Sequence, residues 1–350
     1  FDSVLRFWLD RGAAGFRIDV AHGLVKEEGL PDIASNESTM DGVDNDGSAP
    51  RDDLPAHPFW GREGVHEINR RWRKVLNEYQ DRAMCAEAWV MPLSRMATWV
   101  RPDEYHQTFN FAFLKSKWNQ EELRQVIDES ILEFSHVGAP PTWVLSNHDV
   151  IRHSTRLSYD EVPKQGDGIG PNDTQPDEQL GLKRGRAASA LMLGLPGSVY
   201  IYQGEELGLP EHTTLEGSFR QDPTYFRTSG ERVGRDGCRV PIPWETGAPA
   251  FGFNTTGESW LPQPASFGAY ARDCQEGAAG STLELYRSLL AIRKNFELGH
   301  GAVEWLNDSV PNGAFAFRNG QVVVLVNFTN EPFALPAGEL LVTTQLGLAA

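Results

Sequence analysis

The sequence predicts an α/β domain built on parallel strands over residues 1–297, followed by a small antiparallel β domain over residues 298–350. Short apolar runs alternate with amphipathic helical patterns in the first part, which is typical of parallel strands covered by helices. The last part alternates apolar and polar positions around Asn319 and Gly320, which is typical of an antiparallel hairpin. The 350 residues need not contain this second domain in full.

The elements can be followed along the chain. A first helix is expected at the start, with one apolar face formed by Val4, Leu5, Trp8 and Leu9. Five strands, mostly apolar and therefore buried on both faces, are expected near residues 14, 83, 107, 142 and 197, the third of them over 107–113. Helical periodicity occurs at 65–79, 119–134, 181–197 and 281–296, and long loops are expected at 27–64 and 205–280.

Composition restricts the partners and the compartment. A net charge of -16 repels polyphosphates and anionic lipids, so nucleic acid and membrane surfaces are poor partners. No apolar run reaches the roughly 18 residues that span a bilayer. Three scattered cysteines form neither a disulfide framework nor a CxxC metal site, which favours a reducing, cytoplasmic location. The oligomeric state is not determined by these features.

Three carboxylates follow predicted strands. Asp19 ends "GFRID", Glu87 ends "MCAE" and Asp149 ends "LSNHD". The carboxyl ends of parallel strands meet at one edge of a sheet, so we expect these groups to share a pocket. Like charges that lie close together raise at least one pKa, which supplies a protonated acid beside an ionised base. Such a pair can cleave a glycosidic bond.

Neighbouring residues fit these roles. Arg17 lies two positions before Asp19, on the same side of the strand, and can keep that carboxylate ionised. Trp89 is expected to form an aromatic wall that disfavours the charged form of Glu87. His148 can donate to a sugar hydroxyl. For His22, a contact with the leaving sugar and a local hydrogen bond at a helix start both remain open.

These motifs carry a family resemblance. "GFRIDVAH", "AEAW" and "SNHD" resemble three of the four signature regions of glycoside hydrolase family 13, the α-amylase superfamily. "YIYQGEELGLP" followed by "RDGCRVPIPW" is similar to its α-glucosidase and oligosaccharide-hydrolase branch. The resemblance implies a (β/α)8 TIM barrel of which this chain contains strands 4 to 8, because it begins at Phe1 inside the helix before the fourth strand.

The resemblance also implies an activity: a retaining α-glucosidase acting on α-linked, maltose-like gluco-oligosaccharides without a cofactor. Asp19 is then the nucleophile, Glu87 the general acid/base and Asp149 the transition-state stabiliser. Arg17, His148 and Arg152 match residues around the cleaved sugar. The preference between α-1,4 and α-1,6 bonds stays open, as does the activity of a chain that lacks three barrel strands.

Other interpretations remain. A glucosyltransferase or isomerase on the same barrel, trehalose synthase-like or sucrose-processing, would use the same carboxylates, whereas an inactive barrel would have lost them. A metal-dependent hydrolase would require a His-rich ligand set. The loop 41–53, "DGVDNDGSAPRDD", has Gly42 at an expected calcium-ligand position and lacks a closing Glu, so no metal site is predicted there; calcium elsewhere in a longer parent protein stays open. Glu205 and Glu206, adjacent on an extended chain, are expected to be structural.

Overall fold

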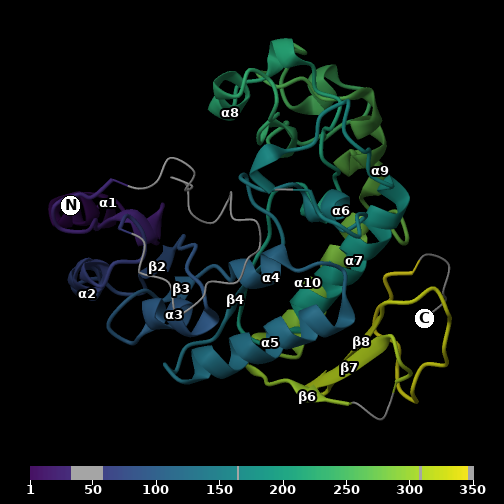
Figure 1. Cartoon of the computed structure of the whole chain (residues 1–350). Helices are drawn as coiled ribbons and strands as arrows, with labels where there is room; N and C mark the ends of the chain where they lie inside the picture. Colours follow the sequence, from purple (N-terminus) through teal and green to yellow (C-terminus); the bar gives the residue numbers. More distant parts are fainter. Residues whose placement is uncertain (33–57, 164, 307–309, 346–350) are drawn as a thin grey trace. The chain divides into compact units, whose positions relative to one another are not determined.

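The chain divides into two compact units, each with its own hydrophobic core. The first contains Phe1–Phe113 and Arg124–Trp143, and the second contains Leu114–Leu123 and Val144–Ala350. The computed structural model describes residues 1–32, 58–163, 165–306 and 310–345 (Figure 1). The loop 41–53, for which no metal site is predicted, lies outside the described residues.

A parallel sheet forms the centre of the first unit. Its strands β1 (Gly15–Ile18), β2 (Ala83–Ala86) and β3 (Gln107–Thr108) are hydrogen-bonded in that order. β1 and β2 run in register from the pair Gly15–Ala83 to the pair Ile18–Ala86. A further parallel bridge joins Phe109 to Thr142, the first residue of β4 (Thr142–Val144). The positions of the strands predicted near residues 14, 83, 107 and 142 are therefore confirmed. The expectation that each strand is buried on both faces is wrong for β1, because none of its residues is fully buried and the charged Arg17 is exposed.

The third strand is shorter than the sequence predicts. The chain leaves the extended conformation after Thr108, and residues 111–115 form the helix α4 (Phe111–Lys115), so the predicted strand over 107–113 is wrong beyond its first part. The reason is Asn110, whose side-chain oxygen accepts a hydrogen bond from the amide of Phe113 at 3.0 Å. Asparagine in this position caps a helix and satisfies an amide that would otherwise lack a partner.

Helices cover this sheet. α1 (Asp2–Leu9) and α2 (Gly64–Leu76) lie side by side and are joined by the ion pair between Arg71 and Asp2, at 2.8 Å (Figure 1). α1 buries Leu5 and Leu9, whereas Val4 and Trp8 are about half exposed, so only part of the predicted apolar face packs on the core. The core of this unit also contains Trp99 of η2 (Thr98–Val100) and Phe134 of α5 (Gln120–Ser135).

Three helices and one strand organise the second unit: α6 (His153–Arg156), α7 (Glu178–Gly194), α10 (Thr282–Asn295) and β5 (Ser198–Tyr200). Asp177 caps α7 by accepting from the amide of Leu180 at 2.9 Å. α7 and α10 share an apolar core, and the Tyr286 hydroxyl lies 2.7 Å from the Ser189 hydroxyl. The long helices predicted at 181–197 and 281–296 are confirmed.

An antiparallel sheet of β6 (Glu304–Trp305), β7 (Ala314–Asn319) and β8 (Val322–Asn327) ends the second unit (Figure 1). Asn319 pairs with Val322, so the turn consists of Gly320 and Gln321, one residue later than predicted. Gly320 has φ of +60°, a value that glycine adopts readily. Asn319 is buried instead, and its amide donates to the Gly194 carbonyl at 2.8 Å, which ties the sheet to α7.

The segment 205–280 contains only short helices, including η4 (Glu205–Leu207), α8 (Pro223–Arg227) and α9 (Arg272–Gln275). Because Glu205 lies in a 3-10 turn, the prediction that it and Glu206 occupy an extended chain is wrong. Glu205 is buried and accepts from the Tyr286 hydroxyl at 3.3 Å, in keeping with the structural role expected for it. Burial raises its pKa to about 8, although the charges of Arg156 and Arg152 act in the opposite direction.

Replacing Gly15 by Ala should destabilise the first unit. An added Cβ would lie 2.0 Å from the carbonyl oxygen of Ala83, so β1 and β2 would have to separate. We expect a loss of about 1–3 kcal/mol in the free energy of unfolding, measured by urea denaturation. Gly247→Ala is the control, because its added Cβ meets no atom within 4 Å. Equal stability of the two variants would contradict the close approach of β1 and β2.

Glu205 should make the protein less stable as the pH rises. An unfolded glutamate loses its proton near 4.5 and folded Glu205 near 8, so the folded state holds more protons over this interval. Burial also raises the pKa of Glu211, to about 7, but Glu211 is present in both the wild type and the variant, so its contribution cancels in the difference between them. We expect Glu205→Gln to remove a slope of up to about 1.4 kcal/mol per pH unit over this interval, measured by denaturation at several pH values. The exposed Glu258→Gln should retain the slope; an unchanged slope in Glu205→Gln would refute the assignment.

Candidate functional site

The predicted nucleophile and acid/base lie at one edge of the parallel sheet. The Glu87 amide donates to the Ile18 carbonyl, and the Ala21 amide donates to the Glu87 carbonyl, both at 2.9 Å. These two bonds extend the pairing of β1 and β2 past the last strand residues. Asp19 and Glu87 are therefore neighbours at the carboxyl ends of the strands, as predicted for this pair.

Arg17 connects the two carboxylates. Its Nη1 lies 2.5 Å from Asp19 Oδ1, and its Nη2 lies 3.8 Å from Glu87 Oε2. The Asp19 side chain is 71% exposed, whereas the Glu87 side chain is 8% exposed. One guanidinium thus faces two carboxyl groups in different environments, an arrangement that can separate their protonation states.

Several contacts set the protonation of Glu87. Burial raises its pKa, and the nearby negative charge of Asp19 adds to this effect. The Val20 amide (2.6 Å to Oε2), the charge of Arg17 and the indole of Trp89 act in the opposite direction without cancelling it. A raised pKa is the direction that a proton donor beside Asp19 requires.

Trp89 acts differently from the prediction. Its ring stacks on Phe111 with centroids 3.7 Å apart, and its Nε1 donates to Glu87 Oε1 at 2.7 Å. This hydrogen bond stabilises the charged carboxylate and lowers the pKa of Glu87. The expectation that Trp89 itself disfavours the charged form is therefore wrong, because the indole turns its polar edge toward the carboxyl group; burial as a whole causes the rise.

Val20 holds a strained backbone conformation between Asp19 and Ala21. Its φ of +43° lies in the left-handed region, which a β-branched residue rarely adopts. Such a conformation costs on the order of 1–3 kcal/mol and persists only when the surroundings enforce it. Here it accompanies the hydrogen bond from the Val20 amide to Glu87, so the turn after β1 is coupled to the buried carboxyl group.

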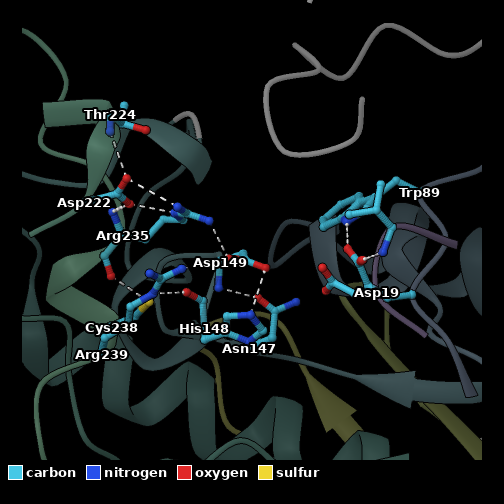
Figure 2. Close-up of polar contacts among 12 residues, drawn as sticks. Asp19, Trp89, Asn147, His148, Asp149, Asp222, Thr224, Arg235, Cys238 and Arg239 are labelled. Carbon is cyan, nitrogen blue, oxygen red and sulfur yellow. Dashed lines mark hydrogen bonds and ion pairs between the residues drawn. The ribbon is translucent and has the colours of Figure 1, made fainter. Parts of the chain in front are cut away.

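Asp149 belongs to the second unit, where two arginines hold it. Arg235 Nη1 and Arg239 Nη2 both donate to its Oδ1, at 2.8 and 2.9 Å (Figure 2). His148 Nε2 lies 3.3 Å from Oδ2, and the Asp149 amide donates to the Asn147 side chain at 2.8 Å. His148 is thus next to Asp149, as the sequence suggests.

Sequence reasoning assigned no role to Arg235 or Arg239. Both lie in "RDGCRVPIPW", a stretch that was singled out for its resemblance, so a signal was present. The residues are more than 80 positions from Asp149 and lie in a segment without regular periodicity. Only the folded chain brings them to its carboxylate.

Two predicted sugar contacts are buried in the structure. Arg152 is 1% exposed, and its guanidinium donates to the carbonyls of Gln203 and Cys238, at 2.8 and 2.9 Å. His22 is 2% exposed, and burial lowers its pKa to about 4, which keeps the ring neutral at neutral pH. A sugar contact of either residue stays a prediction, and so does the meeting of Asp149 with Asp19 and Glu87 in one pocket.

Among residues 1–32, 58–163, 165–306 and 310–345, no group of three or more His, Cys, Asp and Glu is arranged to hold a metal ion. Within the same part of the chain, no helix has the length and apolar character needed to cross a bilayer.

The chain is similar to a known protein family and to several named proteins. Residues 1–301 match the alpha-amylase family, described as "Alpha amylase, catalytic domain". A probable alpha-glucosidase of Rhizobium meliloti is 31% identical over 346 residues, which cover 94% of this chain and 57% of that protein. An alpha-glucosidase of Apis mellifera is 25% identical over 343 residues, or 94% of this chain and 54% of that protein. The chain thus spans little more than half of these relatives.

Solved structures agree on the fold. The crystal structure of an alpha-glucosyl transfer enzyme, XgtA, matches with a TM-score of 0.74 and 27% identity over 97% of this chain and 60% of that one. A trehalose-6-phosphate hydrolase of Bacillus licheniformis matches with a TM-score of 0.72 and 21% identity, covering 99% and 64%, and is similar in fold. The fold is that of the α-amylase catalytic domain, a TIM barrel, with a small antiparallel sheet. The chain belongs to the α-amylase family, glycoside hydrolase family 13.

Proposed function

We propose that the protein containing this chain is a retaining α-glucosidase that hydrolyses α-glucosidic bonds of maltose-like oligosaccharides. The observation that carries the proposal is the pair of carboxyl groups at one strand edge, Asp19 exposed and Glu87 buried, with Arg17 facing both. A retaining glycosidase needs an ionised nucleophile and a protonated acid side by side. The similarity to proteins named alpha-glucosidases supports the substrate class.

The reaction follows in two steps. Glu87 gives its proton to the glycosidic oxygen while Asp19 attacks the anomeric carbon, so the bond to the leaving sugar breaks and a glucosyl–Asp19 ester forms. Glu87, now ionised, takes a proton from water, whose oxygen attacks the anomeric carbon and releases Asp19. Two inversions leave the product in the α configuration.

Asp149 stabilises the transition state in this proposal. Two arginines occupy its Oδ1, and Oδ2 lies toward His148, so Oδ2 and the imidazole can bind sugar hydroxyls together. Contacts that tighten as the sugar ring flattens lower the barrier by differential binding. For the pair Asp19 and Glu87 we propose the separation of about 5 to 5.5 Å that retention requires.

The proposal includes the architecture. β1, β2, β3, β4 and β5 would be strands 4 to 8 of the barrel, with residues 1–297 as the catalytic part and 298–350 as the β domain. The cytoplasmic location also stays a proposal.

Glucosyl transfer is the second candidate. It is favoured by the similarity to a protein described as an alpha-glucosyl transfer enzyme, which is 27% identical. Transfer uses the same glucosyl–Asp19 ester, and the two activities differ only in whether water or a second hydroxyl attacks it. The ratio of free glucose to new glucosides formed from maltose, isomaltose and sucrose decides between them.

Variants of the two carboxylates test the function. We expect Asp19→Asn to lose activity on maltose by a factor on the order of 10⁴ or more. Glu87→Gln should lose about 10²–10⁴-fold on maltose, yet far less on α-glucosyl fluoride, whose leaving group needs no proton. With α-glucosyl fluoride as the substrate, so that only one glucose is released, ¹H NMR should detect α-glucose as the first product of the wild type, and the exposed Glu258→Gln should behave as the wild type. Full activity of Asp19→Asn, or β-glucose as the first product, would refute the proposal.

Trp89→Phe should move the alkaline limb of the kcat/KM profile to higher pH. The variant keeps a ring to stack on Phe111 but removes the hydrogen bond that lowers the pKa of Glu87, so the acid keeps its proton longer. Water entering the vacated volume would lower the pKa instead, so the sign of the shift separates the two effects. Phe111→Leu, which retains the indole donor, is the control and should show no upward shift. A downward shift in Trp89→Phe would contradict the assigned role of the indole.

A further inference from the structure

We propose that Asp222, a residue outside the predicted catalytic set, is a positioning residue for Asp149 that acts through Arg235. The inference rests on the proposed function, because it assigns Asp222 an effect on the transition-state role of Asp149. It concerns contacts within the second unit only.

Arg235 is shared between two carboxylates. Its Nη1 donates to Asp149 Oδ1 at 2.8 Å, while its Nε lies 2.6 Å from Asp222 Oδ2 and its Nη2 lies 3.3 Å from Asp222 Oδ1 (Figure 2). A guanidinium is planar, so two contacts on its Nε edge fix the direction in which Nη1 points. Asp222 therefore determines where Arg235 meets Asp149.

Asp222 is itself held firmly. It is 1% exposed and caps α8, since its Oδ1 accepts from the amide of Thr224 at 2.9 Å. Its own amide donates to Asp236 Oδ2 at 3.0 Å. Gly234 has φ of +73°, and a Cβ there would lie 2.8 Å from the Asp222 carboxyl carbon, so the close approach requires glycine.

Asp222 remains charged in this buried position. Burial by itself raises the pKa of the carboxyl group, but the hydrogen bonds from Arg235 and from the amides of Thr224 and Arg235 outweigh burial and leave the pKa well below its usual range. A buried charge is tolerated when it is paired in this way. The negative charge is thus available to orient Arg235 at the pH where the enzyme would work.

The position of Arg235 determines which oxygen of Asp149 is available to bind a sugar hydroxyl. Arg235 and Arg239 both occupy Oδ1, and His148 lies near Oδ2. If Arg235 rotates away, Oδ1 keeps only Arg239 and the carboxylate can turn. A displaced stabiliser lowers kcat more than it raises KM, because its contacts tighten mainly in the transition state.

The test is Asp222→Asn in the full-length protein. Asparagine keeps the size and the helix cap but loses the charge. We expect kcat on maltose to fall by roughly 10- to 100-fold with KM changed little. Active sites are counted by end-point titration with 5-fluoro-α-glucosyl fluoride, so loss of folded protein does not count as loss of kcat. Asp222→Ser, which also keeps a cap, should behave in the same way if the first variant folds poorly.

Three further variants separate a positioning role of Asp222 from a purely structural one. Asp177→Asn changes the cap of α7, where the side chain of Asp177 accepts only from the amide of Leu180 among the contacts described, and should retain kcat within about twofold. Arg235→Lys keeps the charge but cannot bridge two carboxylates, so it should lower kcat. If Asp222 acts through Arg235, the double variant Asp222→Asn with Arg235→Lys should have a kcat no lower than that of Arg235→Lys alone.

A wild-type kcat per titrated site in both Asp222→Asn and Asp222→Ser would overturn the inference. So would losses that multiply in the double variant, because they indicate two independent effects. These outcomes leave the proposed function intact. Failure of the wild-type protein to cleave any α-glucoside would instead refute the proposed function itself.

Discussion

The parallel pairing of β1 with β2 is the constraint on which the candidate site depends. Side chains alternate along a strand, so the register Ile18 with Ala86 decides that the next residues, Asp19 and Glu87, meet at the same edge. A slip by one residue would turn one carboxylate to the other side of the sheet. Gly15 stabilises this register indirectly, because only a residue without Cβ can lie so close to the Ala83 carbonyl.

Two carboxyl groups of similar chemistry acquire different properties at this edge. Asp19 is open to solvent and Glu87 is buried, and Arg17 faces both of them. Burial raises the pKa of Glu87 by more than the Trp89 indole, the Val20 amide and the Arg17 guanidinium together lower it. The strained turn at Val20 belongs to the same arrangement, since its amide contacts the carboxyl group whose protonation matters most.

The second unit obtains its polar framework from a segment that lacks long helices. Asp236 holds the amide of Asp222, Asp222 contacts Arg235, and Arg235 contacts Asp149. Each contact satisfies a buried or half-buried charge, which a long loop could not otherwise accommodate. Loops fixed by such contacts can carry function as reliably as regular elements do.

Local pattern was sufficient for much of the fold. Apolar periodicity located the strands β1 and β2 and the helices α2, α7 and α10, because the side of an element that faces the core is encoded within the element itself. It failed at residues 109–113, where one Asn110 cap outweighs the strand propensity of its neighbours. The Asn-Gly pattern also predicted the hairpin turn one residue too early. Asn319 is buried at the end of β7, where its side-chain amide donates to the Gly194 carbonyl, so it is not available for the turn.

The sequence by itself determined the family, the order of the elements and the neighbouring positions of Asp19 and Glu87, all of which follow from short motifs and strand alternation. Only the tertiary structure decided that Trp89 donates to Glu87, that Arg152 is buried and that Asp149 is held by Arg235 and Arg239. These features depend on side-chain directions and on contacts across more than 80 residues, and no local periodicity encodes them.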